Sequence, residues 1–270
     1  WKKRRRVMAH GLRVSGWIVG AGREGREGRK GDVKASIRPG SLHSLGYLLE
    51  EEDRQRAAQM YQRALAGKEK TWGPQHTSTL ETVNNLGLLY AALGRLEEAE
   101  TMHQRALAGR EKAWGPQHTS TLETVNNLGI LYKDLGRLEE AETMYQRALA
   151  GREKTWGPHH TSTLTTVNNL GNLYMNLGRL EEAEQMYQRA LAGYAKAIHP
   201  DNLLTCVPAL NNMWAFASLR QSQGRIEDAR HWYSQALLGY EKTLGERSDK
   251  SQALRNNLAA LASEEEEEEG

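Results

Sequence analysis

A block of 42 residues that recurs almost unchanged is the feature that most constrains what this chain can fold into. Residues 77–118 and 119–160 differ at six positions, and a third copy begins at Thr161. Self-similarity at a fixed period of this length is typical of a solenoid, in which each unit buries its apolar face only against its neighbours. The chain is therefore predicted to fold as an array of repeated units.

Each copy contains two runs of apolar residues at three- and four-residue spacing. The runs cover residues 80–93 and 96–107 in the first full copy, and this spacing places apolar side chains on one face of an α-helix. Gly94 is expected to end the first helix, and Gly115 with Pro116 the second. The predicted fold class is therefore all-α, an α-solenoid of antiparallel helix pairs, with helix A and helix B in each repeat.

Capping residues and small residues occupy fixed places in the repeat. In Ser78-Thr79-Leu80-Glu81, the serine hydroxyl and the glutamate carboxylate are expected to satisfy free backbone N–H groups, as in a capping box. Helix A should then begin near Ser78 and, in the next copy, near Ser120. Small residues are predicted where helices A and B approach most closely, at Gly87, Gly129, Gly171, Ala99, Ala141 and Ala183.

A bulky apolar residue ends helix B in every unit. Trp72, Trp114 and Trp156 stand at this position, and Ile198 and Leu244 replace them later in the chain. Because plain aliphatic residues substitute for the indole, the sequence indicates an apolar plug rather than a ring that stacks on a ligand.

These spacings resemble those of the tetratricopeptide repeat family. The residues that carry the resemblance are Leu86, Gly87, Tyr90, Ala99, His103 and Ala106, with Leu128, Gly129, Tyr132, Ala141, Tyr145 and Ala148, and Leu170, Gly171, Tyr174, Ala183, Tyr187 and Ala190. The usual period is 34 residues. The 42-residue form, with its NNLG and GPQH segments, is similar to the repeats of kinesin light chains and, more closely, to arrays in fungal NLR-like proteins. The resemblance implies a protein-binding solenoid that is not an enzyme.

Composition divides the chain into three segments. Residues 1–40 hold twelve Lys/Arg and three Asp/Glu, and many glycines with few apolar residues predict a disordered basic leader. Residues 41–263 form the array, with about four repeats and a capping helix. Residues 264–270 are an acidic tail, expected to be solvated because six adjacent like charges repel.

The last part of the array departs from the repeat. His199-Pro200-Asp201 predicts a loop, and residues 203–224 predict a diverged helix A with about four additional residues. Residues 225–244 predict a helix B, and Asn256 is expected to start a last, unpaired helix A.

The basic leader contains motifs with other meanings. Lys2 to Arg6 could direct nuclear import, which leaves the nucleus as the alternative to a cytoplasmic location. Residues 20–25 match the GxGxxG pattern by coincidence, because the glycine-rich sequence that follows cannot build the required helix. Residues 14–22 are too short to span a bilayer, so no membrane contact is expected. A signal or transit peptide remains open.

Catalytic, cofactor and metal sites are not expected in the array. Cys206 is the only cysteine, which excludes a disulfide framework and favours a reduced intracellular compartment. His76, His118 and His160 recur once per repeat, but successive layers at roughly 10 Å are too far apart to share a metal ion.

Differences between the copies are concentrated on helix A. Three of the six differences between the first two full copies pair Leu88 with Ile130, Ala91 with Lys133 and Ala92 with Asp134, and the third copy changes all three. By analogy with the family, these positions line a concave groove that binds peptides. Free drift of exposed residues is the alternative, and retuned recognition is favoured because exposed positions such as Gln104 have not drifted.

A constant set accompanies the variable one. Asn84, Asn126 and Asn168 should form a ladder whose amides pair with the backbone of an extended peptide. The predicted groove comprises Glu81, Asn84, Leu88, Ala91, Ala92, Glu123, Asn126, Ile130, Lys133, Asp134, Thr165, Asn168, Asn172, Met175 and Asn176. Only Lys133 among them is basic, so the set does not match the two-carboxylate clamp of chaperone-binding relatives.

The sequence predicts a protein–protein interaction scaffold or sensor module for peptide segments. The chain opens with Trp1 and is expected to be part of a larger protein, as in the fungal NLR-like case, with a nucleotide-binding domain upstream. A kinesin-light-chain-like cargo adaptor is the alternative. Nucleic-acid binding through the basic leader is a third option, and it is disfavoured because the array has no basic stripe.

Overall fold

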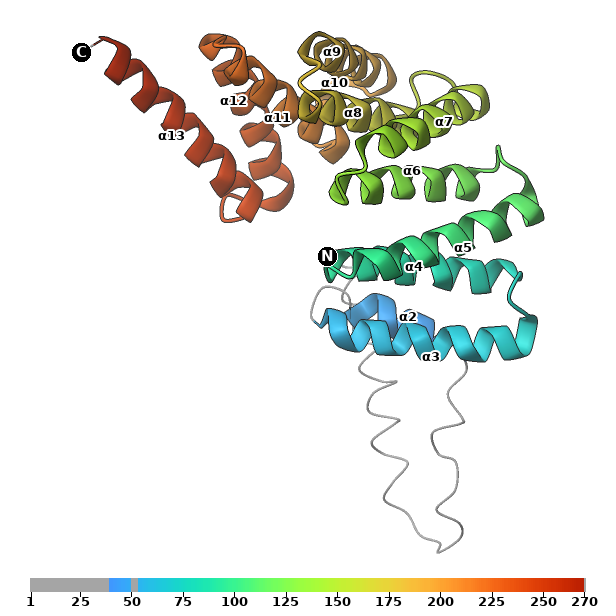
Figure 1. Ribbon diagram of the computed structural model, residues 1–270. Coiled ribbons are helices and arrows are strands. Elements are labelled where there is room, and N and C mark those ends of the chain that lie inside the picture. Colours follow the sequence, from blue (N-terminus) through green and yellow to red (C-terminus); the bar gives the residue numbers. More distant parts are fainter. Residues whose placement is uncertain (1–38, 50–52, 270) are drawn as a thin grey trace, which may run out of the picture. The chain divides into compact units, whose positions relative to one another are not determined.

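The structure is a computed structural model that describes residues 39–49 and 53–269 (Figure 1). It divides into two compact units, residues 1–113 and 114–270. The predicted basic leader and its motifs lie outside the described residues, except for Pro39 and Gly40, which belong to the first described helix. All regular elements in the described ranges are helices.

The first unit contains two helix pairs. Helices α2 (Pro39–Leu49) and α3 (Arg54–Trp72) form the shortened first repeat, and α4 (Thr77–Ala92) and α5 (Leu96–Trp114) form the first full one. Asp53 caps α3, because its side chain accepts a hydrogen bond from the Arg56 N–H. The first repeat is therefore a complete pair despite its weak sequence pattern.

The second unit contains three further pairs and a last single helix. Figure 1 shows them following one another in chain order. They are α6 (Thr119–Asp134) with α7 (Leu138–Trp156), α8 (Thr161–Asn176) with α9 (Leu180–Ala197), the single turn α10 (Pro200–Leu203), α11 (Val207–Ser222) with α12 (Ile226–Leu244), and α13 (Asp249–Glu269). The described residues thus form five helix pairs and a capping helix, one pair more than predicted.

Helix A and helix B meet at the predicted small residues. A Cβ atom placed on Gly129 would lie 2.7 Å from the ring of Tyr145, and one on Gly171 would lie 2.7 Å from the ring of Tyr187. Ala141 and Ala183 are fully buried in the same pairs. The prediction that these positions permit close helix packing is confirmed.

The capping-box prediction is wrong. Helix α6 begins at Thr119, so Ser120 lies inside the first turn, and His118 is the N-cap. His118 Nδ1 accepts the Ser120 N–H at 3.2 Å, and His76 and His160 do the same for Ser78 and Ser162. The repeated histidine is therefore a helix-capping residue.

The tryptophan at the end of helix B is not an apolar plug. Trp72 is 45% exposed, and its ring stacks on His76 with the centroids 5.3 Å apart. Trp114 and Trp156 stack on His118 and His160 at 4.8 and 5.0 Å. The indole thus covers the capping imidazole of the following helix.

Two expectations for the last part of the chain are also wrong. His199 caps the short helix α10, where a loop was predicted. Helix α13 begins at Asp249 and not at Asn256, because the paired asparagines lie inside helix A in every copy. The backbone of α13 remains helical through the glutamates to Glu269.

Candidate functional site

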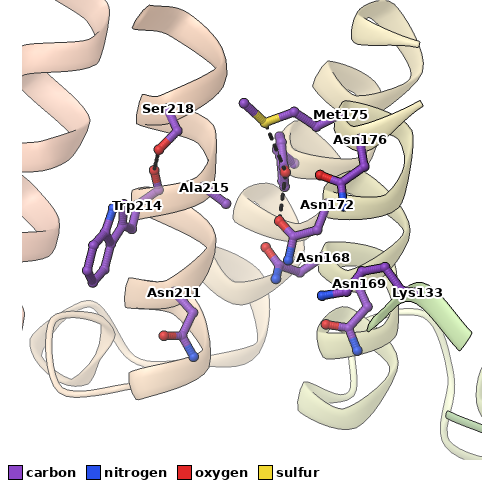
Figure 2. A pocket seen from close by; sticks show the side chains of 11 residues that line it. Lys133, Asn168, Asn169, Asn172, Met175, Asn176, Asn211, Trp214, Ala215 and Ser218 are labelled. Carbon is purple, nitrogen blue, oxygen red and sulfur yellow. Dashed lines mark hydrogen bonds between the residues drawn. The ribbon is translucent and has the colours of Figure 1, made fainter. Parts of the chain in front are cut away.

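A cavity of about 530 Å³ lies on the helix A side of the second unit. Helices α8 and α11 supply most of its lining, and α6 and α9 contribute one residue each (Figure 2). Its lining residues are Lys133, Asn168, Asn169, Asn172, Met175, Asn176, Tyr187, Asn211, Trp214, Ala215 and Ser218. The volume falls in the range of ligand pockets, and the lining is dominated by amide and hydroxyl groups.

Five predicted groove residues line this cavity, namely Lys133, Asn168, Asn172, Met175 and Asn176. The α11 wall was missed, because helix A there is displaced from the 42-residue register. The buried residues Leu164 and Leu210 occupy equivalent places 46 residues apart. With that offset, Asn211 corresponds to Thr165 and Ser218 to Asn172, so realignment on the apolar residues would have found them.

The asparagine ladder is largely buried. Asn84, Asn126 and Asn168 are 2%, 6% and 7% exposed. Within the second unit, Asn126 Oδ1 accepts from the Thr166 hydroxyl and from Asn169 Nδ2, both at 3.3 Å, and Asn168 Oδ1 accepts from Asn212 Nδ2 at 2.8 Å. The carbonyl ends of Asn126 and Asn168 therefore connect each helix A to the next one along the chain.

The other predicted groove residues are more accessible. Leu88 is 43% exposed and Ile130 36%. Lys133 and Asp134 form an ion pair at 3.2 Å, which offsets the only basic charge of the cavity. The remaining predicted residues are exposed or half-buried on helix A of their own repeat: Glu81, Ala91 and Ala92 on α4, Glu123 on α6 and Thr165 on α8.

A buried tyrosine on helix B supports the cavity from behind. The ring of Tyr187 is fully buried, and its hydroxyl donates to Asn172 Oδ1 at 2.7 Å. Met175 Sδ is a second acceptor at 3.9 Å. Burial raises the pKa of the Tyr187 phenol, so it remains a protonated donor at neutral pH.

The same arrangement recurs between α11 and α12. The Tyr233 hydroxyl lies 3.0 Å from Ser218 Oγ and donates to Gln221 Oε1 at 3.1 Å. Asn211 Oδ1 accepts from the Tyr240 hydroxyl and, at 3.1 Å, from Lys250 Nζ. Burial raises the pKa of Tyr240 to about 12.

Buried cations join helix B of one repeat to helix A of the next. Lys68 Nζ donates to Ser78 O at 3.0 Å and to the Thr82 hydroxyl at 2.7 Å. Arg152 Nη1 makes the equivalent bonds to Ser162 O and Thr166, at 2.8 and 2.6 Å. Burial lowers the pKa of both groups. The sequence did not predict the burial of these residues, because a single basic residue in an amphipathic helix is expected to be exposed to solvent.

Among residues 39–49 and 53–269, no three His, Cys, Asp or Glu side chains are grouped as metal ligands would be. Within the same ranges, every helix is too short or too polar to cross a bilayer.

Comparison with known families identifies the fold. The tetratricopeptide repeat family matches residues 40–112, 78–154 and 120–196, and a second model of the same repeat matches residues 217–249. These matches cover more than half of the chain. The protein belongs to the tetratricopeptide repeat family.

Several solved structures share this fold. A variant of a Podosopora anserina putative kinesin light chain with nearly identical TPR-like repeats is 25% identical, with a TM-score of 0.62 over 77% of this chain and 96% of that one. BtubC (BKLC) from P. vanneervenii is 21% identical, with a TM-score of 0.63 over 78% and 82%. The Rap conjugation gene regulator of plasmid pLS20, in complex with the Phr* peptide, is 19% identical, with a TM-score of 0.62 over 80% and 60%. A search of curated proteins found no match.

Proposed function

We propose that this protein is an interaction scaffold whose helix A surface binds a peptide segment of a partner protein. The single observation that carries the proposal is the cavity between α8 and α11, lined by five of the predicted recognition residues. Its neutral donors and acceptors suit the backbone and polar side chains of an extended peptide. The Rap regulator complex supports this assignment, because a protein of the same fold is in complex with a peptide there.

We propose further that the array is the binding arm of a larger polypeptide with a nucleotide-binding domain upstream of Trp1. A kinesin-light-chain-like adaptor is the second candidate, favoured by the likeness to the Podosopora anserina protein. The reading frame upstream of Trp1 distinguishes the two. A nucleotide-binding domain there supports the first, and a heptad coiled coil supports the second.

The binding proposal is tested by filling the cavity. Ala215 is half-buried in the cavity lining, so Ala215→Leu adds three carbon atoms to the space a peptide would occupy. Ala192→Leu on the exposed surface of α9 is the matched control. Both variants and the wild-type full chain would be panned against a displayed random peptide library.

We expect Ala215→Leu to lose the peptides that the wild-type chain and Ala192→Leu enrich. A wild-type chain that enriches no peptide contradicts the proposed function. Equal enrichment by all three chains would place peptide binding on another surface.

A further inference from the structure

The protein donates hydrogen bonds to the side-chain carbonyl oxygens of three asparagines in the cavity lining, Asn168, Asn172 and Asn211. Lys250 Nζ and the Tyr240 hydroxyl both bond to Asn211 Oδ1, and a lysine ammonium can only donate, so this oxygen must face it. Asn168 Oδ1 accepts from Asn212, and Asn172 Oδ1 accepts from Tyr187. Three carbonyl oxygens of the lining are therefore already engaged.

The NH₂ groups of these amides are consequently left to donate to a ligand. The structure places no acceptor against Nδ2 of Asn168, Asn172 or Asn211 among the described residues. Asn211 is exposed and Asn172 is half-buried, whereas Asn168 is 7% exposed. Lys133, also in the lining, adds a fourth donor. When the carbonyl oxygen of an amide accepts a hydrogen bond from the protein, its NH₂ group remains available to donate to a ligand.

Tyr187 is the residue that fixes this polarity at Asn172. Its ring is fully buried, and its hydroxyl donates to Asn172 Oδ1, so this contact uses the carbonyl end of the Asn172 amide and leaves the NH₂ group unused. The preceding repeat provides a natural contrast, because Tyr145 has the same buried position, while Ile130 and Lys133 stand where the later repeat has Asn172 and Met175. The described structure contains no hydrogen bond from the Tyr145 hydroxyl to a residue of α6.

We infer that the α8–α11 cavity is a subsite for a hydrogen-bond acceptor oxygen of the bound peptide, and that Tyr187 is a positioning residue that sets this specificity from behind the surface. The inference rests on the proposed peptide binding. The acceptor oxygen belongs to a side-chain carboxamide, a side-chain carboxylate or a backbone carbonyl. These three sources share one chemistry, and the experiment separates them.

The test compares Tyr187→Phe with Tyr145→Phe in the full chain. Each variant removes one hydroxyl and retains the ring that packs against Gly171 or Gly129, so both should fold. The probes are peptides selected by the wild-type chain, resynthesised with Gln, Glu or Leu at each position in turn and with ester bonds replacing single backbone amides, which weakens each carbonyl as an acceptor.

The wild-type chain should bind peptides with Gln or Glu more tightly than peptides with Leu at one position, or should bind less tightly when one backbone amide of the peptide is replaced by an ester. In Tyr187→Phe, this preference should fall by about 2- to 12-fold, the ratio expected for one hydrogen bond. Tyr145→Phe should retain it. A Gln preference identifies a carboxamide, a Glu preference a carboxylate, and an ester effect a backbone carbonyl.

Three results would overturn the inference. The first is the absence of any acceptor preference in peptides that bind the wild-type chain. The second is a preference that survives in Tyr187→Phe, and the third is an equal loss in both variants, which would indicate a purely structural effect. Each of these leaves peptide binding intact. Failure of the wild-type chain to enrich any peptide would remove the proposed function as well.

Discussion

Helix pair α4–α5 in the first unit and helix pair α8–α9 in the second come from copies of one 42-residue block, yet their helix A surfaces differ. The packing residues are the same, and Val83 with Ala99 is as fully buried as Val167 with Ala183. The accessible residues are Leu88, Ala91 and Ala92 in one pair and Asn172, Met175 and Asn176 in the other. The same set of packing residues therefore supports an apolar helix A surface in one pair and a polar one in the other.

The buried helix B residue under each surface also differs between the two pairs. Tyr187 supplies a hydroxyl to Asn172, whereas His103 is fully buried and its two ring nitrogens have no hydrogen-bond partner in the described structure. The shorter imidazole occurs where the accessible residues, Leu88 and Ala91, have no polar side-chain group to receive a bond. The comparison indicates that the two pairs differ both in the buried residue of helix B and in the exposed residues of helix A.

The largest expected effect comes from disrupting the packing of helix A against helix B. Gly129→Leu should lower the free energy of unfolding by about 3 kcal/mol, because even a Cβ atom would lie 2.7 Å from the Tyr145 ring. Thermal unfolding followed by circular dichroism measures the loss. Lys133→Ala, one turn away and half-exposed, is the control. Equal melting temperatures for the two variants would contradict the packing of the pair.

Acid should affect the first unit through His103. Burial, and secondarily the charge of Arg110, lowers the pKa of His103 to about 4. The unfolded chain takes up this proton near pH 6.5 and the folded chain only near pH 4, so the contribution to stability is lost as pH falls through that interval. The loss is on the order of 3 kcal/mol.

His103→Tyr introduces the residue that the second copy has at this position, and it should remove the contribution of His103 to the acid dependence of stability. Denaturant unfolding of both chains at several pH values between about 7 and 4 measures it. Parallel pH profiles for wild type and variant would show that His103 does not carry the effect.

A smaller loss is expected where the asparagine ladder joins two helices. Asn126→Ala removes the acceptor shared by Thr166 and Asn169, and should cost about 1–3 kcal/mol of stability. Peptide affinity should also fall, because the α8 amides would lose their anchor. Asn176→Ala is a suitable control for stability only, since that side chain is exposed but also lines the cavity. A stable Asn126→Ala variant with reduced affinity for every peptide would instead favour direct pairing with the ligand.

The smallest effect is expected at the acidic end. Deletion of residues 264–270 should leave peptide binding unchanged, because helix α13 already covers the last pair through Leu254 and Leu261. Circular dichroism should change only by the loss of the final turns of α13. Loss of binding by the shortened chain would show that the glutamates take part in recognition.

The fold could be predicted from the sequence because the repeated block contains the same packing residues several times. The periodic leucines, Gly129 and Gly171 predicted the helix pairs and their closest contacts, and the structure confirms both. The helix starts near Ser78 and Ser120 were predicted to within one residue, but the capping residue was not, because a histidine cap has no common sequence signal. Only the backbone angles of His118 and its bond to Ser120 distinguish this cap from the predicted capping box.

The site was predicted in part for a related reason. Helix A positions in the regular copies follow from the period, so Asn172 and Met175 were assigned to the surface that proved to line the cavity. The opposite wall on α11 was missed because about four additional residues shift its register. Tyr187 was identified only as part of the repeat signature, since a hydrogen bond from a buried hydroxyl to a half-buried amide depends on side-chain geometry.

The central claim is that a fixed frame presents variable helix A residues that choose the partner. The most direct test exchanges Lys133 and Asp134 for the alanines of the first copy, Ala91 and Ala92, and repeats the peptide selection with the full chain. Stability should change by less than about 0.5 kcal/mol, because Asp134 is exposed and Lys133 is only half-buried. The account predicts a changed set of selected peptides at an unchanged melting temperature. Identical peptide sets from the two chains would contradict it.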